Sequence, residues 1–208
     1  MGNRQVAFLG FLCLTVIFIT SCAKEEGLDL FTSSELNLPE TPFKYKSINL
    51  PSHFRNNVPR QMLPTSVNGL YNTPSDNPIT DGGATLGSVI YYETKLSANG
   101  TISCASYHEQ AKGFSDDDVL SMGFDGGMTA RHSMTSINAR FYQRCQFFWD
   151  ERASTLEEPV LMSFQDLVEM GMTLDEVVST IISQSYYPEL FEKAFESEEV
   201  SADRISKA

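Results

Sequence analysis

The residues Cys104-Ala105-Ser106-Tyr107-His108 have the types and spacing that most strongly suggest chemistry. A c-type haem site follows the pattern C-x-x-C-H, in which two thiols add to the porphyrin vinyl groups and the histidine binds the iron. One helical turn presents these side chains to the same porphyrin edge. Here Tyr107 stands at the second cysteine. On these residues alone, a buried cysteine next to a surface histidine is the more ordinary explanation.

Helices joined by long glycine-containing loops are expected to position this motif. Thr80 should cap a helix that ends near Leu96, followed by a turn at 97–100 and a short helix over 102–109. Residues 112–131 are expected to form a loop. The acidic run within this loop, Ser115-Asp116-Asp117-Asp118, favours a helix N-terminus over a metal site, because its spacing does not fit a calcium loop.

The remainder of the chain also favours helices. A short helix or turn is expected at 136–142. Helices are expected from Arg152 up to an end or kink at Pro159, after the capping box of Thr173 and Glu176, and from Tyr187 with Pro188 at its start. At 201–208 the pattern is that of an N-cap, Ser201, and the first turn of a helix. No segment alternates polar and apolar residues as an exposed strand does. The predicted fold is therefore mainly α: a cytochrome-c-like helical domain with long loops, preceded by an irregular N-terminal arm.

Composition limits the classes of function. The 208 residues include 27 acidic and 15 basic side chains, which gives a net charge of −12. A nucleic-acid-binding protein needs a basic face to meet phosphates, and charge-driven membrane binding needs basic clusters. Because 41% of the residues are hydrophobic, the chain can bury a core and wholesale disorder is excluded.

The N-terminus has the pattern of an exported lipoprotein. Arg4 precedes the apolar run Val6 to Thr20, and Ile19-Thr20-Ser21-Cys22 resembles a bacterial lipobox. We expect a signal peptide at 1–21, lipid on Cys22 and a polar tether or irregular arm over 22–76. This predicts a protein of the cell envelope, anchored by lipid on the periplasmic side or on the outer-membrane surface. An ordinary cleaved signal peptide is the alternative.

Residues 77–208 resemble, segment by segment and in order, the first half of bacterial di-haem cytochrome c peroxidases. Before the motif, Leu86 to Ser97 and Asn99-Gly100 match the helix and turn that precede the first haem. The matching segments after it are Gly113-Phe114-Ser115-Asp116, Arg131-His132-Ser133-Met134, Asn138-Ala139, Phe147 to Ala153, Leu156-Glu157-Glu158, Gln165 to Gly171 and Tyr187 to Phe191. This order is far more specific than any single segment.

The resemblance implies roles for four residues. His108 would be the proximal ligand of the haem iron, and Cys104 would attach one haem c through a single thioether. Glu169 matches the catalytic glutamate that moves protons as the O–O bond of hydrogen peroxide breaks. Trp149 matches a tryptophan implicated in electron passage. Without the family match, Glu169 is a helix-end acid before Thr173 and Trp149 a core aromatic.

The resemblance also implies a reaction and partners. It is the reduction of hydrogen peroxide to water, with electrons from a small donor protein such as a cytochrome. The excess of acidic side chains favours the binding of a positively charged electron donor. Two alternatives remain: a mono-haem electron-transfer protein or inactive haem-binding remnant, and a haem-free surface lipoprotein that binds a partner.

Several positions depart from the family pattern. Tyr107 removes one thioether, Glu151 replaces a glycine, Pro159 stands at a pocket glutamine and Ser163 at a common proline. Phe124 stands where some members have a distal histidine, and His132 where some have a calcium-binding asparagine, which weakens the case for calcium. His132, Met122, Met128 and Met134 are other candidate ligands of the iron, although loop or core methionine is the commoner role.

The family's second domain, with its own C-x-x-C-H motif, is not present in this sequence, and we expect the chain to be incomplete at its C-terminus. Cys145 is expected to be a buried structural thiol. A Cys104–Cys145 disulfide is the alternative in an export compartment, and it would exclude a thioether at Cys104.

Overall fold

The computed structural model describes residues 36–38, 44–47, 73–142 and 144–208. The predicted signal peptide, Cys22 and most of the predicted arm lie outside these residues, so the boundaries at 21/22 and 76/77 stay predictions. One described part of the arm contacts the domain, because the backbone N–H of Lys46 donates a hydrogen bond of 2.8 Å to Asp81. None of the helices in the described ranges is long and apolar enough to cross a membrane.

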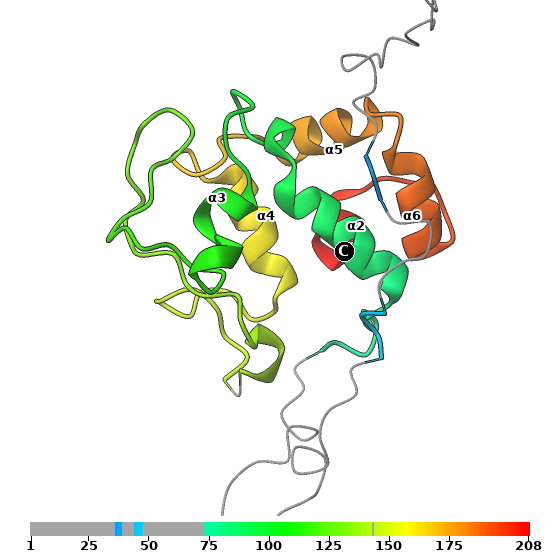
Figure 1. Ribbon diagram of the computed structural model, residues 1–208, viewed down its shortest axis with the longest axis horizontal. Helices are drawn as coiled ribbons and strands as arrows, with labels where there is room; N and C mark the ends of the chain where they lie inside the picture. Colours follow the sequence, from blue (N-terminus) through cyan, green and yellow to red (C-terminus); the bar gives the residue numbers. More distant parts are fainter. Residues whose placement is uncertain (1–35, 39–43, 48–72, 143) are drawn as a thin grey trace, which may run out of the picture. The chain divides into compact units, whose positions relative to one another are not determined.

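The described part of the chain is helical and contains no β-strand, so the mainly α class is confirmed (Figure 1). The α-helices are α2 (Asp81–Tyr92), α3 (Cys104–Tyr107), α4 (Glu157–Gln165), α5 (Leu174–Ile182), α6 (Tyr187–Phe195) and α7 (Ala202–Lys207). Short 3-10 turns occur at Thr94–Leu96, Gln110–Lys112 and Ala139–Phe141. Outside the helices, backbone pairing in the described residues is limited to isolated β-bridges, such as those of Glu109 with Ser115 and of Phe147 with Ala153.

Local capping explains where several helices begin. The Thr80 hydroxyl accepts the N–H of Gly83 at 2.9 Å at the start of α2. Thr173 and Glu176 form the predicted capping box at the start of α5. Pro188 lies in the first turn of α6, where its missing N–H has no intrahelical partner to lose. These predicted starts are confirmed.

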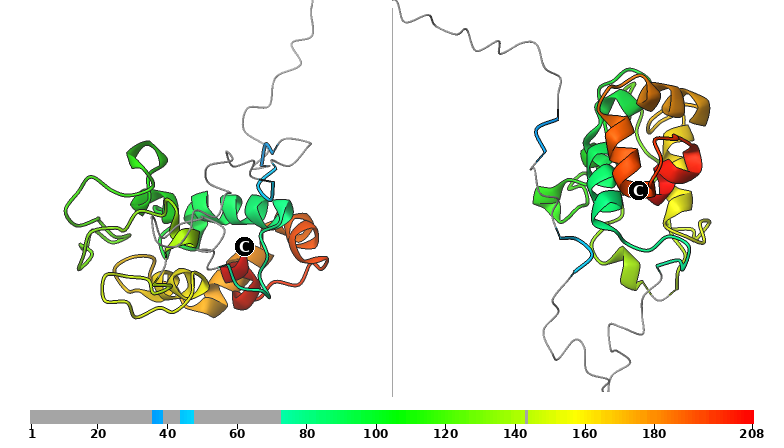
Figure 2. Two further views of the ribbon diagram at one scale, coloured as in Figure 1. Left: turned by 90° about the horizontal axis from the view of Figure 1, so that it is seen from below. Right: turned by 90° about the vertical axis from the view of Figure 1, so that its right-hand side faces the viewer.

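The hydrophobic core lies between α2 and the C-terminal helices. Leu86 of α2, Ile181 of α5 and Phe191 of α6 are fully buried in one cluster. Figures 1 and 2 show α2, α6 and α7 side by side. The six-residue helix α7 would be marginal alone. It is stabilised because Ile205 is buried in the same cluster.

The loop segment 109–156 differs from the helical part of the domain in what holds it together. None of its described residues belongs to the buried hydrophobic cluster or to the partly buried residues packed against it. Its described residues contain no helix longer than three residues. Ion pairs connect its parts: Asp150 pairs with both Arg131 and Arg152, each at 2.8 Å, and Arg144 pairs with Glu151 at 2.7 Å.

Three sequence-based expectations differ from the structure. Helix α4 begins at Glu157 instead of Arg152, and Pro159 lies in its first turn, where the ring is tolerated, instead of ending it. The acidic run does not begin a helix. Asp116 accepts the N–H of Asp118 at 2.9 Å within a bend, and the Lys112 ammonium pairs with Asp117. The short helix at the motif is also narrower than expected, at Cys104–Tyr107.

Candidate functional site

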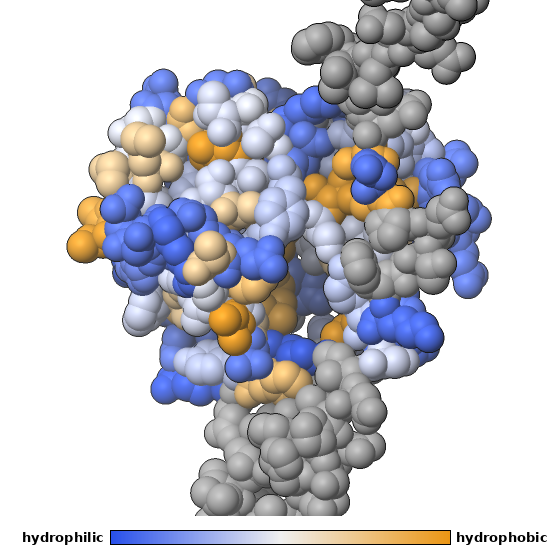
Figure 3. All heavy atoms as spheres, in the orientation of Figure 1, coloured by the Kyte–Doolittle hydropathy of each residue, from blue (hydrophilic) through white to orange (hydrophobic). Residues whose placement is uncertain are grey.

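A cavity of about 1120 Å³ lies among α2, α3, α4, α7 and the loops at 128–136 and 147–152. Figure 3 shows a hollow near the middle of the face seen there, with hydrophobic residues at its edge. Much of the cavity wall is apolar, with Ile90, Met134, Phe147, Leu156 and Phe164 among its residues. Cavities that hold drug-sized ligands measure roughly 300–1,000 Å³, so this one is large enough for a ligand of at least that size.

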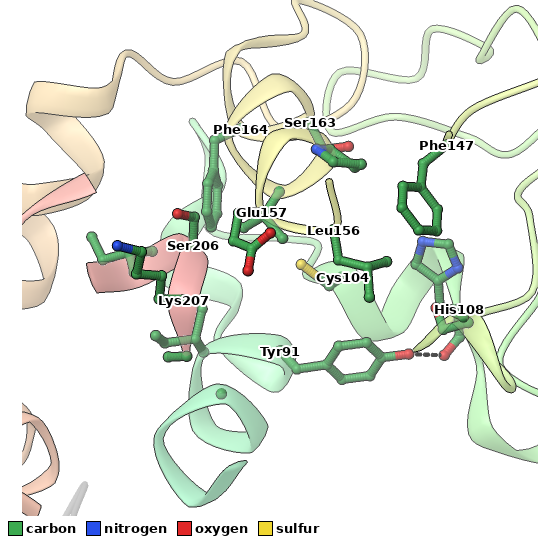
Figure 4. A pocket seen from close by; sticks show the side chains of 18 of the residues that line it. Tyr91, Cys104, His108, Phe147, Leu156, Glu157, Ser163, Phe164, Ser206 and Lys207 are labelled. Atoms are coloured by element: carbon green, nitrogen blue, oxygen red, sulfur yellow. Dashed lines mark hydrogen bonds between the residues drawn. The ribbon is translucent and has the colours of Figure 1, made fainter. Parts of the chain in front are cut away.

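The turn of α3 supplies the three motif side chains to this wall. Cys104, Tyr107 and His108 all line the cavity. The N–H of His108 closes the turn by donating to the Cys104 carbonyl at 3.0 Å. In Figure 4, Tyr91 of α2 meets the end of α3, where its hydroxyl donates to the backbone carbonyl of His108. The motif is therefore fixed both within α3 and from α2.

The imidazole of His108 has the properties of a metal ligand. Burial lowers its pKa, and the backbone carbonyls of Met134 and Phe114 only partly oppose this shift. The neutral ring is therefore favoured, and neutral imidazole is the form that binds metals. Its Nδ1 atom is buried and has no partner within hydrogen-bonding geometry. An orphaned ring nitrogen on an apolar cavity wall fits a group that brings its own metal.

Cys104 carries a free thiol, so the alternative disulfide with Cys145 is not formed in this structure. Burial raises the pKa of the Cys104 thiol to about 11, and the Glu169 carboxylate adds to this shift. The thiol is therefore protonated at neutral pH. It lies one turn from His108 on the same wall, which is the placement that a single thioether requires.

Tyr107 occupies the position of the missing second cysteine. Its side chain is 6% exposed and belongs to the buried hydrophobic cluster. The hydroxyl donates a hydrogen bond of 3.0 Å to the backbone carbonyl of Glu169, 62 residues further along the chain. The phenol therefore contacts the turn that carries the predicted catalytic acid.

Glu169 lies in the turn after α4, is half-buried and lines the same cavity as Cys104 and His108. Burial raises the pKa of its carboxyl group, while the Ser163 hydroxyl and Arg152 favour the ionised form and partly oppose the shift. Its backbone N–H donates to Asp166 at 3.1 Å. A half-buried carboxyl group on the cavity wall, with its pKa raised by burial, has the chemistry of a general acid-base.

Trp149 borders the cavity but is 59% exposed, so the core-aromatic alternative is wrong. Its indole N–H donates to the backbone carbonyl of His132 at 2.8 Å. The side chain thus connects the cavity wall to the protein surface.

The other candidate ligands differ in their access to the cavity. Both ring nitrogens of His132 are engaged, with the Asp118 carbonyl at 2.8 Å and the Ser115 hydroxyl at 3.3 Å. Met122 is 65% exposed and is not among the cavity-lining residues, whereas Met128 and Met134 are. Phe124 is not on the wall either, because its ring packs at Gly171.

Sequence reasoning missed three features of the site. Tyr91 was assigned only to an apolar helix face. Glu157 lines the cavity, with one carboxylate oxygen accepting from Asn77 at 2.8 Å and the other buried without a partner. Asp150 pairs with Arg131 and Arg152, and the pair with Arg131 joins the two loops of the cavity wall. Only the resemblance at 147–153 could have drawn attention to Asp150, since Arg131 lies 19 residues away in the chain.

Comparison with known proteins identifies the family. The sequence profile described as di-haem cytochrome c peroxidase matches residues 81–208. The chain belongs to the di-haem cytochrome c peroxidase family. The match begins with α2 and includes the haem-like motif and Glu169.

Relatives within the di-haem cytochrome c peroxidase family include two types of protein. The chain is 32% identical over 135 residues to methylamine utilization protein MauG of Methylophilus methylotrophus, covering 65% of this chain and 40% of that protein. It is 32% identical over 125 residues to cytochrome c551 peroxidase of Nitrosomonas europaea, covering 60% and 37% respectively. The chain thus spans about two fifths of the length of these relatives.

A solved structure supports the same assignment. A MauG-like protein associated with microbial copper homeostasis superimposes with a TM-score of 0.59 at 29% identity, covering 66% of this chain and 42% of that one. Membership of the di-haem cytochrome c peroxidase family implies haem c. The cavity, the neutral ring of His108 and the free thiol of Cys104 fit that group.

Proposed function

We propose that this chain holds one haem c in the cavity, with His108 as the proximal ligand and Cys104 as the single covalent attachment. We propose further that the site reduces hydrogen peroxide to water. The observation that supports both is the convergence of Cys104, His108 and Glu169 on one largely apolar cavity. The overall reaction is H2O2 + 2e⁻ + 2H⁺ → 2H2O, with both electrons supplied by a reduced donor protein.

The protein's own residues contribute binding, exclusion of water and proton transfer. When bound, a haem c supplies the redox-active iron. His108 presents a neutral ring nitrogen, and apolar residues such as Phe147 and Phe164 keep bulk water out of the cavity. Glu169 takes a proton from one peroxide oxygen and returns it to the departing one, a role that suits a carboxyl whose pKa burial has raised.

Electrons are proposed to enter near Trp149, because this side chain both borders the cavity and is exposed. The chain's net charge of −12 favours a basic donor such as a small cytochrome. Site-directed changes at Trp149 should therefore slow reduction by the donor more than reaction with peroxide.

Covalent haem is the first point to test. The full chain, matured with c-type assembly machinery, should give a haemochrome spectrum that survives denaturation and is typical of one thioether. Cys104→Ala should lose the covalent haem, and His108→Ala should lose the proximal ligand. A wild-type protein without covalent haem would contradict the proposal and favour a haem-free partner-binding protein.

Peroxide turnover is the second point. Glu169→Gln should lower peroxide consumption by about 10²- to 10⁴-fold, the usual loss when a general acid-base is removed. Glu192→Gln is the matched control, because Glu192 is exposed on α6 and does not line the cavity. Slow stoichiometric bleaching of the wild type by peroxide would instead indicate a mono-haem carrier or remnant.

We also propose that the protein is anchored in the cell envelope by lipid on Cys22, which lies outside the described residues. The proposal rests on the lipobox-like residues 19–22. Mass spectrometry of the mature N-terminus should show a diacylated cysteine that is absent in Cys22→Ser. A mature N-terminus at another residue would overturn it.

A further inference from the structure

Tyr107 joins two parts of the site that are distant in sequence. It belongs to the turn that carries Cys104 and His108, and its hydroxyl donates to the backbone carbonyl of Glu169 at 3.0 Å. The donor side chain is buried, so the hydrogen bond is shielded from water.

The turn that receives this hydrogen bond is built around Asp166. Its carboxylate accepts the N–H of Val168 at 2.8 Å and the N–H of Glu169 at 3.1 Å, and its carbonyl accepts the N–H of Gly171 at 2.8 Å. These bonds shape the turn from within. Tyr107 contributes a buried side-chain contact that links the turn to the haem-binding motif.

We propose that Tyr107 is a positioning residue: its phenol ties the haem-attachment turn to the peptide of Glu169 and thereby sets where the Glu169 carboxyl lies in the cavity. This inference rests on the proposed function, in which Glu169 moves protons. A cysteine at 107 is too short to make the same hydrogen bond. This chain therefore has a non-covalent connection between the two walls in place of a second thioether.

Hydrogen exchange of the full chain tests the connection without relying on turnover. Removing the hydroxyl group in Tyr107→Phe should speed exchange of the Gly171 and Glu169 amides by about three- to tenfold, the effect of one net hydrogen bond. Tyr187→Phe is the matched control, because the Tyr187 side chain is fully buried and its hydroxyl has no partner. Exchange in α5 should not change in either variant.

The titration of Glu169 provides the second readout. In ¹³C-glutamate-labelled protein, with Glu169→Gln used for assignment, the pKa of Glu169 should move down towards its ordinary value in Tyr107→Phe. The shift is downward because a loosened turn exposes the carboxyl to water. Tyr107→Cys should cause the same shift, although it restores the second thiol and should add a second thioether to the haemochrome spectrum.

The outcomes separate this inference from the proposed function. Unchanged turn exchange and an unchanged Glu169 titration in both Tyr107 variants would overturn the positioning role, even if Glu169→Gln abolishes turnover. If both readouts change while Glu169→Gln leaves peroxide consumption intact, the connection exists but the proton-transfer role of Glu169 fails.

Discussion

The hydroxyl of Tyr91 donates a hydrogen bond to the backbone carbonyl of His108 and so joins helix α2 to the end of α3. The carbonyl belongs to the residue expected to bind the haem iron. Because α2 packs on α6 in the core, this hydrogen bond restrains the motif relative to the core.

Removing this hydroxyl should loosen the motif. We expect Tyr91→Phe to lower the free energy of unfolding by about 1–2 kcal/mol, because a half-buried hydrogen bond is lost and the carbonyl of His108 loses its donor. The neighbouring change Tyr92→Phe removes only an exposed contact with Gln110 at 3.3 Å and should cost less than about 0.5 kcal/mol. Denaturant unfolding measures both, and equal losses would contradict the role of Tyr91.

Gly171 is expected to tolerate no side chain. Its φ is +69°, and an added Cβ would overlap the ring of Phe124. Gly171→Ala should therefore lower the unfolding free energy by about 2–4 kcal/mol, from backbone strain and steric overlap together. Gly100 has a similar φ of +72° but open space around it, so Gly100→Ala should cost only about 1–2 kcal/mol. If the two variants lose the same stability, the contact with Phe124 is unimportant.

The stability of the haem-free protein should depend on pH through His108. Burial lowers the pKa of this ring in the folded state, so the unfolded chain binds the extra proton more readily. The stabilisation that the neutral ring permits is complete above a pH of about 6.5 and is lost as the pH falls through the lowered folded value. Melting curves between pH 5 and 7 should show a smaller slope for His108→Gln than for the wild type. An identical slope would mean that the ring is solvated.

The Cys104 thiol should react slowly. A pKa of about 11 leaves roughly one thiol in a thousand ionised at pH 8, so alkylation should be about two orders of magnitude slower than at an ordinary cysteine. The rate should rise about tenfold for each pH unit up to pH 10. Peptide mapping by mass spectrometry measures this rate, and the denatured chain provides the control. Equally rapid labelling of the folded and denatured chains would show that the thiol is not buried.

Helix starts were predictable because their signals are local. The Thr173–Glu176 capping box and Pro188 each act within one turn of the chain, and both lie where expected. Pro159 misled because proline is compatible with a first turn but not with a helix interior, and sequence alone did not locate the start of α4. The acidic run does not begin a helix; its residues lie in a bend where Asp117 pairs with Lys112, a contact that the spacing of the run does not encode.

The residues of the site also differ in whether local sequence signals could predict them. Cys104 and His108 are neighbours in one turn, so their spacing made a haem-like role a candidate, and the resemblance of the surrounding segments made it the leading hypothesis. Glu169 was found only through the family resemblance, because nothing in its own neighbourhood indicates that it reaches the same cavity. The contacts of Tyr91 and Tyr107 could not be foreseen, since each joins a side chain to a backbone carbonyl in a different element.

The loop segment 109–156 adds nothing to the buried hydrophobic cluster, yet it provides much of the cavity wall. Several of its apolar residues, including Met134 and Phe147, line the cavity. A ligand in this cavity would take the place that buried side chains have in the rest of the domain. A ligand that binds only when these loops are ordered should therefore stabilise them, by an amount that grows with the logarithm of its concentration divided by its dissociation constant.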